Sequence, residues 1–394
     1  MIRMAVDTRS TILALADQCV MCGLCLPFCP TYGLDGQEAE SPRGRIAMAA
    51  ALARGTVAPE PALRLHLDHC LGCMGCERVC PANVKYGDLL VETRALLGPG
   101  PDYPHALTAA LKRPFLLRLM KKSRMGALLG RLGRRRPARS AWGAALGLMP
   151  RTSYRTALPR LASANTGKTH VAIFPGCVAS VEDADAQRAA ELLLGAAGFR
   201  VSVLPALCCG AMDAHGGLAA GAARSAAQVR EAWTSLGAER LVTVTPGCLS
   251  TLRRALPDTP VDDATALIAA NAASLRFKPL NERVALHIPC TQANVARSDD
   301  ALRRLLQGIS GVDLKPLPAA PYCCGAAGTH MLEFPERAAI LRDEKLDQVA
   351  GLAPDLLLSS NIGCRLHLAA GMSGASRVRH LHPLTLLARQ LETS

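Results

Sequence analysis

The stretch from Cys19 to Pro30 reads CVMCGLCLPFCP and places four cysteines at the spacing C-x2-C-x2-C-x3-C-P. This spacing is typical of bacterial 4Fe–4S sites, in which thiolates bind the irons. Three thiolates at three-residue intervals can surround one face of a cubane cluster. The fourth cysteine of such a run binds the other cluster in two-cluster proteins. The stretch therefore predicts a second run elsewhere in the chain.

The second run occupies residues 69–81 and reads HCLGCMGCERVCP. We predict a crossed assignment, in which each run gives three cysteines to one 4Fe–4S cluster and its fourth to the other. One cluster takes Cys19, Cys22, Cys25 and Cys80, and the other takes Cys70, Cys73, Cys76 and Cys29. The alternatives are zinc and disulfides. Zinc sites usually pair C-x2-C knuckles without the C-x3-C-P tail, so we favour iron–sulfur ligation.

The bulk composition indicates a multidomain protein of a reducing compartment. A chain of 394 residues has room for about two or three domains. Hydrophobic residues make up 49% of it, but only 3% are aromatic, so alanine, leucine and valine must fill the cores. The sixteen cysteines fall in tight repeated clusters, unlike the disulfide scaffold of a short secreted chain. We see no signal peptide and no run of about 20 apolar residues, and expect a cytoplasmic protein.

Residues 1–98 contain both cysteine runs and are predicted to form a mostly helical domain with two 4Fe–4S clusters. Ser41 and Pro42 suit the cap and first turn of a helix. Arg43 and Arg45 follow, and either offset the negative charge of a cluster or belong to a solvated helix start. Helices are expected over residues 46–53, 61–68 and 87–97.

Residues 99–166 form a basic linker rich in proline, glycine and arginine. Between Asp102 and Arg160 there are fourteen lysines and arginines and one acid, so this segment carries a net charge equal to the +13 of the whole chain. Apolar residues alternate with the cations: Phe115, Leu116, Leu117, Leu119, Met120, Leu128, Leu129 and Leu132. Such a basic amphipathic segment can bind an anionic membrane surface, dock on an acidic partner subunit or cover the clusters. We do not expect it to bind nucleic acid.

From Lys168 onward the chain repeats itself. The first copy contains VAIFPGC, LCCG and VTVTPGC, and the second contains VALHIPC, YCCG and LLLSSNIGC. The cysteines are Cys177, Cys208, Cys209 and Cys248 in the first copy, and Cys290, Cys323, Cys324 and Cys364 in the second. Matching cysteines are offset by 113 to 116 residues. This near-constant offset predicts two copies of one structural unit, at 167–275 and 276–394.

Within each copy, short apolar runs alternate with alanine-rich helical segments. Strands are expected over 171–174, 201–204, 241–245, 284–288, 312–317 and 355–359, and helices over 184–197, 218–236, 299–307 and 335–349. The alternation predicts parallel sheets with crossover helices. The predicted fold is therefore multidomain, a mostly α-helical dicluster ferredoxin domain followed by two tandem α/β cysteine-rich repeats.

The eight cysteines of the repeats are further candidates for metal ligands. Each follows the carboxyl end of a predicted strand, the edge at which open α/β sheets bind ligands. The adjacent cysteines of each Cys-Cys-Gly turn can bind two irons of one cluster, with Gly210 or Gly325 allowing close approach of the backbone. Helix N-termini after the strands would favour thiolates. The alternatives are zinc and buried free cysteines that pack as small apolar residues.

These motifs resemble those of the iron–sulfur subunit of bacterial glycolate oxidase. That subunit belongs to the larger group of Cys-Cys-Gly-domain proteins, which also includes subunits of anaerobic glycerol-3-phosphate dehydrogenase and of heterodisulfide reductase. The resemblance covers nearly the whole chain and rests on CVMCGLCLPFCPTYGL, SPRGRI, HLDHCLGCMGCERVCPANVKYGDLL, LCCGAMDAH, HIPCTQAN, YCCGAAGTH and SSNIGCRLHL. SPRGRI, the HxPC element at 287–290 and NIGC favour glycolate oxidase over its relatives.

The resemblance implies an electron-transfer subunit of an oxidoreductase complex. Partner subunits with FAD would oxidise glycolate to glyoxylate, with D-lactate as a further substrate, and this chain would pass electrons to a quinone or another acceptor. No G-x-G-x-x-G follows a predicted strand, so we expect no flavin and no catalytic residue on this chain. It would be cytoplasmic or peripheral on the inner face of the membrane. The alternatives are an iron–sulfur subunit of a glycerol-3-phosphate or lactate dehydrogenase, and a heterodisulfide-reductase-like thiol redox protein.

The chain departs from the wider group at two positions. Heterodisulfide-reductase-like repeats end in CxxC, which gives five ligands for a non-cubane cluster, but here Thr245 and Asn361 stand at the earlier cysteine position. Four thiols remain in each repeat, enough for one or two further clusters in the two repeats together. The absence of the fifth cysteine argues against disulfide-reducing chemistry of the heterodisulfide reductase kind. Four histidines lie near these cysteines: His215, His287, His330 and His367. They could bind iron, relay protons, contact a quinone or simply hydrogen-bond turns.

Overall fold

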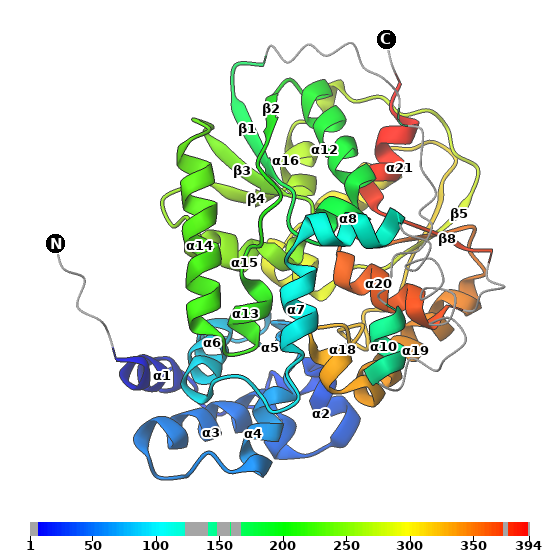
Figure 1. Cartoon of the computed structure of the whole chain (residues 1–394). Helices are drawn as coiled ribbons and strands as arrows, with labels where there is room; N and C mark the ends of the chain where they lie inside the picture. Colours follow the sequence, from blue (N-terminus) through cyan, green and yellow to red (C-terminus); the bar gives the residue numbers. More distant parts are fainter. Residues whose placement is uncertain (1–6, 123–140, 148–157, 159–166, 373–376, 393–394) are drawn as a thin grey trace.

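The computed structural model describes residues 7–122, 141–147, 158, 167–372 and 377–392. A layer of helices from the N-terminal part lies beneath two α/β units (Figure 1). The predicted fold class is confirmed. The leucines at 128, 129 and 132 of the basic linker lie outside the described residues.

The N-terminal part is helical, as predicted, and we call residues 7–98 the ferredoxin segment. Ser41 caps its longest helix, since the Ser41 hydroxyl accepts a hydrogen bond from the backbone N–H of Gly44 at 2.9 Å, and Pro42 occupies the first turn. Its helices are α1 (Thr8–Ala16), η1 (Leu26–Phe28), α2 (Pro30–Asp35), η2 (Glu38–Glu40), α3 (Pro42–Arg54), α4 (Pro61–Asp68), α5 (Gly75–Arg78) and α6 (Tyr86–Leu97). Helices α1, α3 and α6 enclose a core of aliphatic side chains, including Ile12, Ile46 and Leu89.

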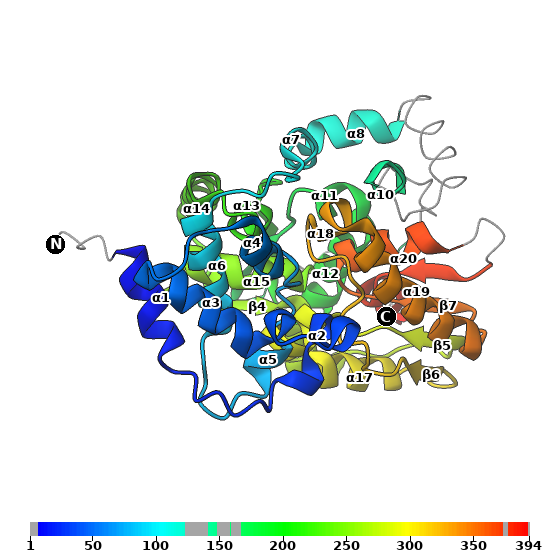
Figure 2. The same cartoon turned by 90° about the horizontal axis from the view of Figure 1, so that it is seen from below.

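The described part of the basic linker contains α7 (His105–Leu111), α8 (Pro114–Lys122) and α10 (Ala141–Gly147). Helix α10 packs against the second repeat, and α8 projects along the outside of the molecule (Figure 2). Leu117 of α8 is buried, whereas Phe115 and Leu119 are 75% and 58% exposed. Among the described residues, no helix is both long enough and apolar enough to cross a membrane.

Each repeat contains a parallel four-stranded sheet, in the order β2-β1-β3-β4 in the first and β6-β5-β7-β8 in the second. The strands are β1 (His170–Phe174), β2 (Arg200–Val203), β3 (Arg240–Thr243), β4 (Val261–Asp263), β5 (Arg283–Leu286), β6 (Asp313–Pro316), β7 (Leu356–Leu358) and β8 (Arg379–Leu381). All six predicted strands are present within two or three residues at each end. The apolar pattern missed β4 and β8, because each is a three-residue strand at the end of its sheet with charged or polar side chains.

Helices cover both faces of the sheets. They are α11 (Ala179–Glu182), α12 (Ala184–Ala196), α13 (Ala211–His215), α14 (Ala219–Thr234), η3 (Pro246–Cys248), α15 (Leu249–Ala255), α16 (Ala264–Ala270), η4 (Ala272–Ser274), η5 (Gln292–Ala296), α17 (Asp299–Gln307), α18 (His330–Glu333), α19 (Pro335–Leu352), α20 (Ile362–Gly371) and α21 (Pro383–Gln390). The predicted helices appear as α12, α14, α17 and α19. The C-terminal α21 was not predicted from the sequence pattern.

The two repeats share one apolar core. Helix α21 of the second repeat packs on α12 of the first. Leu193 and Leu194 of α12 belong to one buried apolar cluster with Leu384 and Leu387 of α21. The core thus crosses the predicted boundary at residue 275, and the domain limits at 98, 166 and 275 stay predictions. The ferredoxin segment covers one end of this pair, with α6 beside α13 and α5 beside η5 (Figure 2).

Candidate functional site

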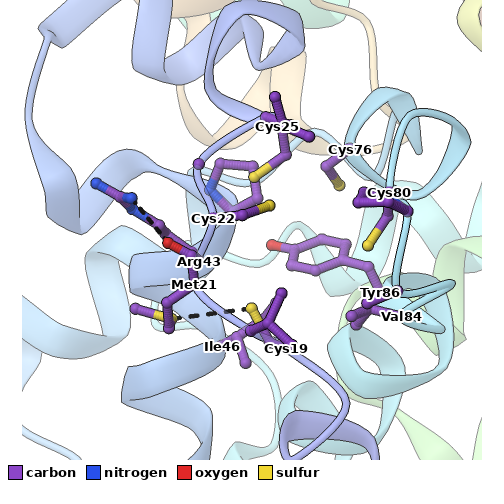
Figure 3. A pocket seen from close by; sticks show the side chains of 16 residues that line it. Cys19, Met21, Cys22, Cys25, Arg43, Ile46, Cys76, Cys80, Val84 and Tyr86 are labelled. Carbon is purple, nitrogen blue, oxygen red and sulfur yellow. Dashed lines mark hydrogen bonds between the residues drawn. The ribbon is translucent and has the colours of Figure 1, made fainter.

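The predicted ligands of the first cluster line one cavity of the ferredoxin segment (Figure 3). We call Cys19, Cys22, Cys25 and Cys80 the outer set; all four line the cavity, together with Cys76. All sixteen cysteines lie in the described part of the chain, and Cys22 is the exposed one among them. The fold therefore gathers thiols from two distant runs, as crossed ligation requires.

Both cysteine runs share an unusual backbone conformation. The second and fourth residues after the first cysteine have positive φ, at Met21 (+56°) and Gly23 (+83°) in one run and Gly72 (+57°) and Met74 (+58°) in the other. Each methionine holds this conformation at a cost of about 1–3 kcal/mol. The Arg43 guanidinium donates to the Met21 carbonyl oxygen at 3.1 Å and supports the first loop. Strain that neighbouring groups maintain is typical of a functional loop.

The other predicted set, Cys70, Cys73, Cys76 and Cys29, lies deeper, and we call it the inner set. Burial raises the pKa of Cys76 most, and the thiols of Cys73, Cys70, Cys29 and Cys25 raise it further, so Cys76 has members of both sets as neighbours. The Cys70 sulfur is 3.4 Å from the buried Tyr86 hydroxyl. Buried thiols with raised pKa values become thiolates only with a compensating cation, which iron can provide.

A buried arginine lies beside Cys29. Arg45 is 1% exposed, and its Nη1 is 4.0 Å from the Cys29 sulfur and 2.9 Å from the Thr31 hydroxyl oxygen. Arg45 Nη2 donates to a Glu40 carboxylate oxygen at 2.5 Å. Of the two roles considered from the sequence, Arg45 fits the one in which it offsets the negative charge of thiolates. Arg43 instead forms a partly exposed ion pair with Glu38.

Glu40 is the centre of a network that the sequence did not reveal. One carboxylate oxygen faces His66 Nδ1 at 2.7 Å and His69 Nδ1 at 2.8 Å, an arrangement that resembles a metal site. The other faces two cations, Arg45 at 2.5 Å and Arg337 at 3.5 Å. Although burial alone would raise it, the pKa of Glu40 falls to about 2 because His69, His66 and Arg45 stabilise the carboxylate. Two neighbouring guanidinium groups would repel a metal ion, so this is an ion-pair network that ties α3 and α4 together.

The four thiols of the first repeat form one continuous group. Cys177 contacts Cys208, Cys208 contacts Cys209, and Cys209 contacts Cys248. The pKa of Cys208 rises to about 12: the hydrogen bond with Cys177 lowers it, but the bond with Cys209 and burial outweigh this effect. The thiols converge at the carboxyl ends of β1, β2 and β3, where the sequence predicted them.

The second repeat gathers its thiols in the same way. The Cys290 and Cys323 sulfurs are 3.9 Å apart, Cys323 contacts Cys324, and Cys324 contacts Cys364. The hydrogen bond with Cys323 raises the pKa of Cys290, and burial raises it further. Both repeats thus present four contacting thiols, a donor set that fits an iron–sulfur cluster or another thiophilic metal centre. Which of these cysteines bind metal stays a prediction.

The second repeat also lies against the inner set. Cys73 and Cys323 belong to one buried apolar cluster, and Cys290 packs against it. Burial raises the pKa of Cys73 most, and among the neighbouring thiols Cys290 raises it more than Cys29 or Cys70 does. No feature of the sequence pattern indicated which repeat would bring its thiols beside the inner set.

The residues at the two positions that lack the CxxC cysteine have different surroundings. Asn361 caps α20 by accepting a hydrogen bond from the Gly363 backbone N–H at 2.9 Å, and it donates to the Thr291 hydroxyl at 3.0 Å. Thr245 is 5% exposed and ends the segment that follows β3. Neither side chain can supply a thiolate, so each repeat keeps four candidate ligands.

The four histidines divide into two pairs. The ring of His287 hydrogen-bonds the Ser359 hydroxyl at 2.9 Å, and that of His367 donates to the Ala338 carbonyl at 3.0 Å, so both have structural partners. His215 and His330 occupy matching positions of the repeats and line one small cavity with Arg94. Burial lowers the pKa of His215 to about 4 and that of His330 to about 3, which keeps both rings neutral.

Comparisons with known proteins agree with this arrangement. The sequence pattern of the 4Fe-4S dicluster domain matches residues 15–84, and that of the cysteine-rich domain matches twice, at residues 171–253 and 284–369. The chain is 30% identical over 435 aligned residues to the probable glycolate oxidase iron-sulfur subunit of Bacillus subtilis, with 95% of this chain and 94% of the relative covered. The chain belongs to the family of glycolate oxidase iron–sulfur subunits.

Other members and neighbours of the family are similar to the chain to different extents. The glycolate oxidase iron-sulfur subunit of Escherichia coli is 29% identical, with 92% of this chain and 91% of that protein covered. Lactate utilization protein A of Geobacillus kaustophilus is 30% identical over 105 residues, which is 26% of this chain and 44% of that protein. The family resemblance expected from the sequence motifs is thereby confirmed, as is an iron–sulfur protein of the oxidoreductase class.

Proposed function

We propose that the chain relays electrons within a glycolate oxidase complex. Flavin-bearing partner subunits would oxidise glycolate, and D-lactate as a further substrate, and this chain would carry the electrons to a quinone or another acceptor. The observation that carries the proposal is the convergence of the outer and inner cysteine sets in one segment that is packed against a further four-thiol group. The names of the most similar relatives support the choice of glycolate.

The outer and inner sets would hold two 4Fe–4S clusters, and each repeat would hold at most one more. When bound, such a cluster accepts and releases one electron at a time at a potential that hydrogen bonds, burial and nearby charge adjust. The protein supplies these influences through Arg45 beside Cys29 and the Tyr86 hydroxyl beside Cys70. Iron and sulfide analysis after anaerobic purification would count the clusters: about eight irons for two, about twelve for three and about sixteen for four.

We propose that the flavin-bearing subunit docks over the outer cysteine loop. Exposed Cys22 is flanked in this loop by Val20 (69% exposed), Met21 (47%) and Leu24 (57%), and exposed apolar side chains that lie together often mark an interface. The adjacent Arg43 and Glu38 neutralise each other. An apolar face without net charge suits a stable subunit contact better than a transient electrostatic encounter.

This docking surface can be tested by copurification. The double variant Met21→Glu/Leu24→Glu should lose the flavoprotein while keeping its iron. The control is Leu65→Glu, because Leu65 is also an exposed leucine of the ferredoxin segment, at 44%. Equal loss of the partner from both variants would argue against a contact specific to the cysteine loop.

We further propose that α8 contacts an anionic membrane surface. Phe115 and Leu119 are exposed one helical turn apart, with the exposed Arg118 between them. The surrounding sequence from 102 to 160 has fourteen basic residues and one acid, which complements negatively charged lipids. The variant Phe115→Ala/Leu119→Ala should sediment less with phosphatidylglycerol vesicles than a control with Ile340→Ala, which is an exposed apolar residue of α19. Unchanged sedimentation would exclude this role for α8.

The overall proposal is tested by reduction of the reconstituted complex. With the flavoprotein subunits present, anaerobic addition of glycolate should bleach the visible absorption of the clusters, and a quinone analogue should restore it. D-lactate should also bleach the clusters, glycerol 3-phosphate serves as the competing substrate, and a disulfide substrate tests for disulfide reduction by cysteine thiols. If glycerol 3-phosphate bleached the clusters and glycolate did not, the substrate of the complex would be glycerol 3-phosphate and the proposed substrate would be wrong. Failure of every substrate with an intact complex would refute the relay.

A further inference from the structure

The loop that carries Cys73 is fixed to the second repeat by a side-chain clamp. Asn294, in η5, donates from Nδ2 to the Cys73 carbonyl oxygen at 2.7 Å. In return, Arg78 of the ferredoxin segment donates to the Ala293 carbonyl oxygen at 3.1 Å. Two hydrogen bonds in opposite directions thus join the loop of the inner set to the loop that follows Cys290.

Apolar groups close the space between the two thiol sets. Cys73 is 8% exposed and Cys323 is 4% exposed, and both lie in one cluster with Leu71 and Leu341. The rings of Phe28 and Tyr322 contact each other beside it, with centroids 5.3 Å apart. Phe28 directly precedes Cys29, and Tyr322 directly precedes Cys323. The inner set and the second repeat are therefore separated by protein atoms of a packed core.

The first repeat meets the ferredoxin segment through different groups. Arg94 donates to the carbonyl oxygen of His215 at 3.0 Å, and the hydroxyl of Tyr103, in the adjoining basic linker, donates to that of Met212 at 3.4 Å. These acceptors are in α13, after the Cys-Cys-Gly turn. Four residues past Cys177, at the place that matches Asn294, stands Val181, whose side chain carries no hydrogen-bond donor. The first repeat thus reaches the inner-set loop through the His215 ring, which lies beside Gly72, whereas the second repeat packs two of its own thiols, Cys290 and Cys323, in one cluster with Cys73.

We propose that the second repeat is the electron-exchange neighbour of the ferredoxin segment and that Asn294 is the positioning residue of that contact. The inference rests on the proposed relay function, and it specifies which repeat exchanges electrons with the inner set. In each transfer a cluster held by the inner set would lose one electron, and a cluster held by Cys290, Cys323, Cys324 and Cys364 would gain it. No bond is made or broken and no proton moves.

The inference can be tested by electron paramagnetic resonance of the dithionite-reduced protein, because neighbouring paramagnetic clusters broaden or split each other's signals. Removal of a thiol from the second repeat, in Cys364→Ser, should abolish the broadening of the inner-set signal. The matched change in the first repeat, Cys248→Ser, should leave it. The reverse result would overturn the assignment.

The role of Asn294 has its own variants. Asn294→Ala and Asn294→Leu should lose the broadening while keeping wild-type iron. The control Asn271→Ala also removes an asparagine whose amide donates to a backbone carbonyl, that of Leu267 at 2.9 Å, but far from the clamp. Full broadening in an iron-replete Asn294 variant would overturn its positioning role.

Different experimental results would refute the proposed relay and the proposed contact with the second repeat. Iron analysis that finds no metal in the second repeat would refute the inference, while glycolate-driven bleaching of the remaining clusters would leave the relay standing. Absence of glycolate-driven bleaching, with normal broadening in dithionite, would refute the relay alone. Comparison of Cys364→Ser with Cys248→Ser still decides between the repeats if an Asn294 variant loses iron.

Discussion

Replacement of Glu40 by glutamine should loosen the ferredoxin segment far more than the same change at Glu38. Both residues belong to η2, and each pairs with an arginine of α3. Glu40 and Arg45 are 2% and 1% exposed, whereas the side chain of Glu38 is 51% exposed. Removing one partner of a buried ion pair costs about 3–5 kcal/mol, because the other charge stays buried and uncompensated. An exposed pair contributes about 0.2–1 kcal/mol.

The assay is amide hydrogen exchange of the cluster-loaded protein, followed by mass spectrometry over α3 and α4. Since about 1.4 kcal/mol corresponds to a tenfold change in an opening equilibrium, Glu40→Gln should accelerate exchange in these helices by about 100-fold or more. Glu38→Gln should accelerate it by less than about tenfold. Iron should also leave Glu40→Gln faster in the presence of a chelator, since Arg45 contacts Cys29. Similar exchange in both variants would refute the view that the buried network holds the helices together.

Two further predictions concern the repeats. Burial raises the pKa of Asp263 to about 6 against an ordinary value of 3.8, so the folded wild type keeps a proton that the unfolded chain loses, and its stability falls as the pH rises through this range. Asp263→Asn lacks this loss and should gain about 1–2 kcal/mol relative to wild type between pH 5 and pH 8, measured by thermal denaturation; parallel pH profiles would contradict the assignment. A Cβ at Gly325 (φ +85°) would come within 2.5 Å of the Ala338 carbonyl oxygen, whereas at Gly210 (φ +87°) its nearest neighbour would be 3.1 Å away. Both alanine variants should therefore be strained, but Gly325→Ala should be less stable than Gly210→Ala by about 1–3 kcal/mol. Gly325→Ala should also lose iron from the second repeat at a lower temperature. Iron analysis after mild heating checks this, and earlier loss of iron from Gly210→Ala would contradict it.

Local signals in the sequence were sufficient to predict the elements and to group the cysteines. Thiol spacing identified the two runs, Ser41-Pro42 marked the start of α3, and a constant offset revealed the repeats. These features depend on neighbours in the chain, so they can be read without tertiary structure. The same holds for the strands β1 and β5, which are buried apolar runs.

Contacts between distant segments could not be predicted. Nothing near Glu40 in the sequence indicates that His66, His69 and Arg337 will surround it, because those partners arrive from α4 and from the second repeat. Asn294 likewise belongs to a motif noted for its cysteine, yet its amide acts on a loop 221 residues away. The edge strands β4 and β8 escaped notice because pairing with a neighbour, rather than an apolar pattern, makes them strands.

The shared core of α12 and α21 has a consequence for biosynthesis. Domains usually fold in turn as they leave the ribosome, the N-terminal one first. Here the first repeat cannot complete the core beneath α12 until residues 383–390 have been translated, because Leu384 and Leu387 belong to the same core as Leu193. The α12 face of the first repeat therefore stays uncovered while the second repeat is being synthesised.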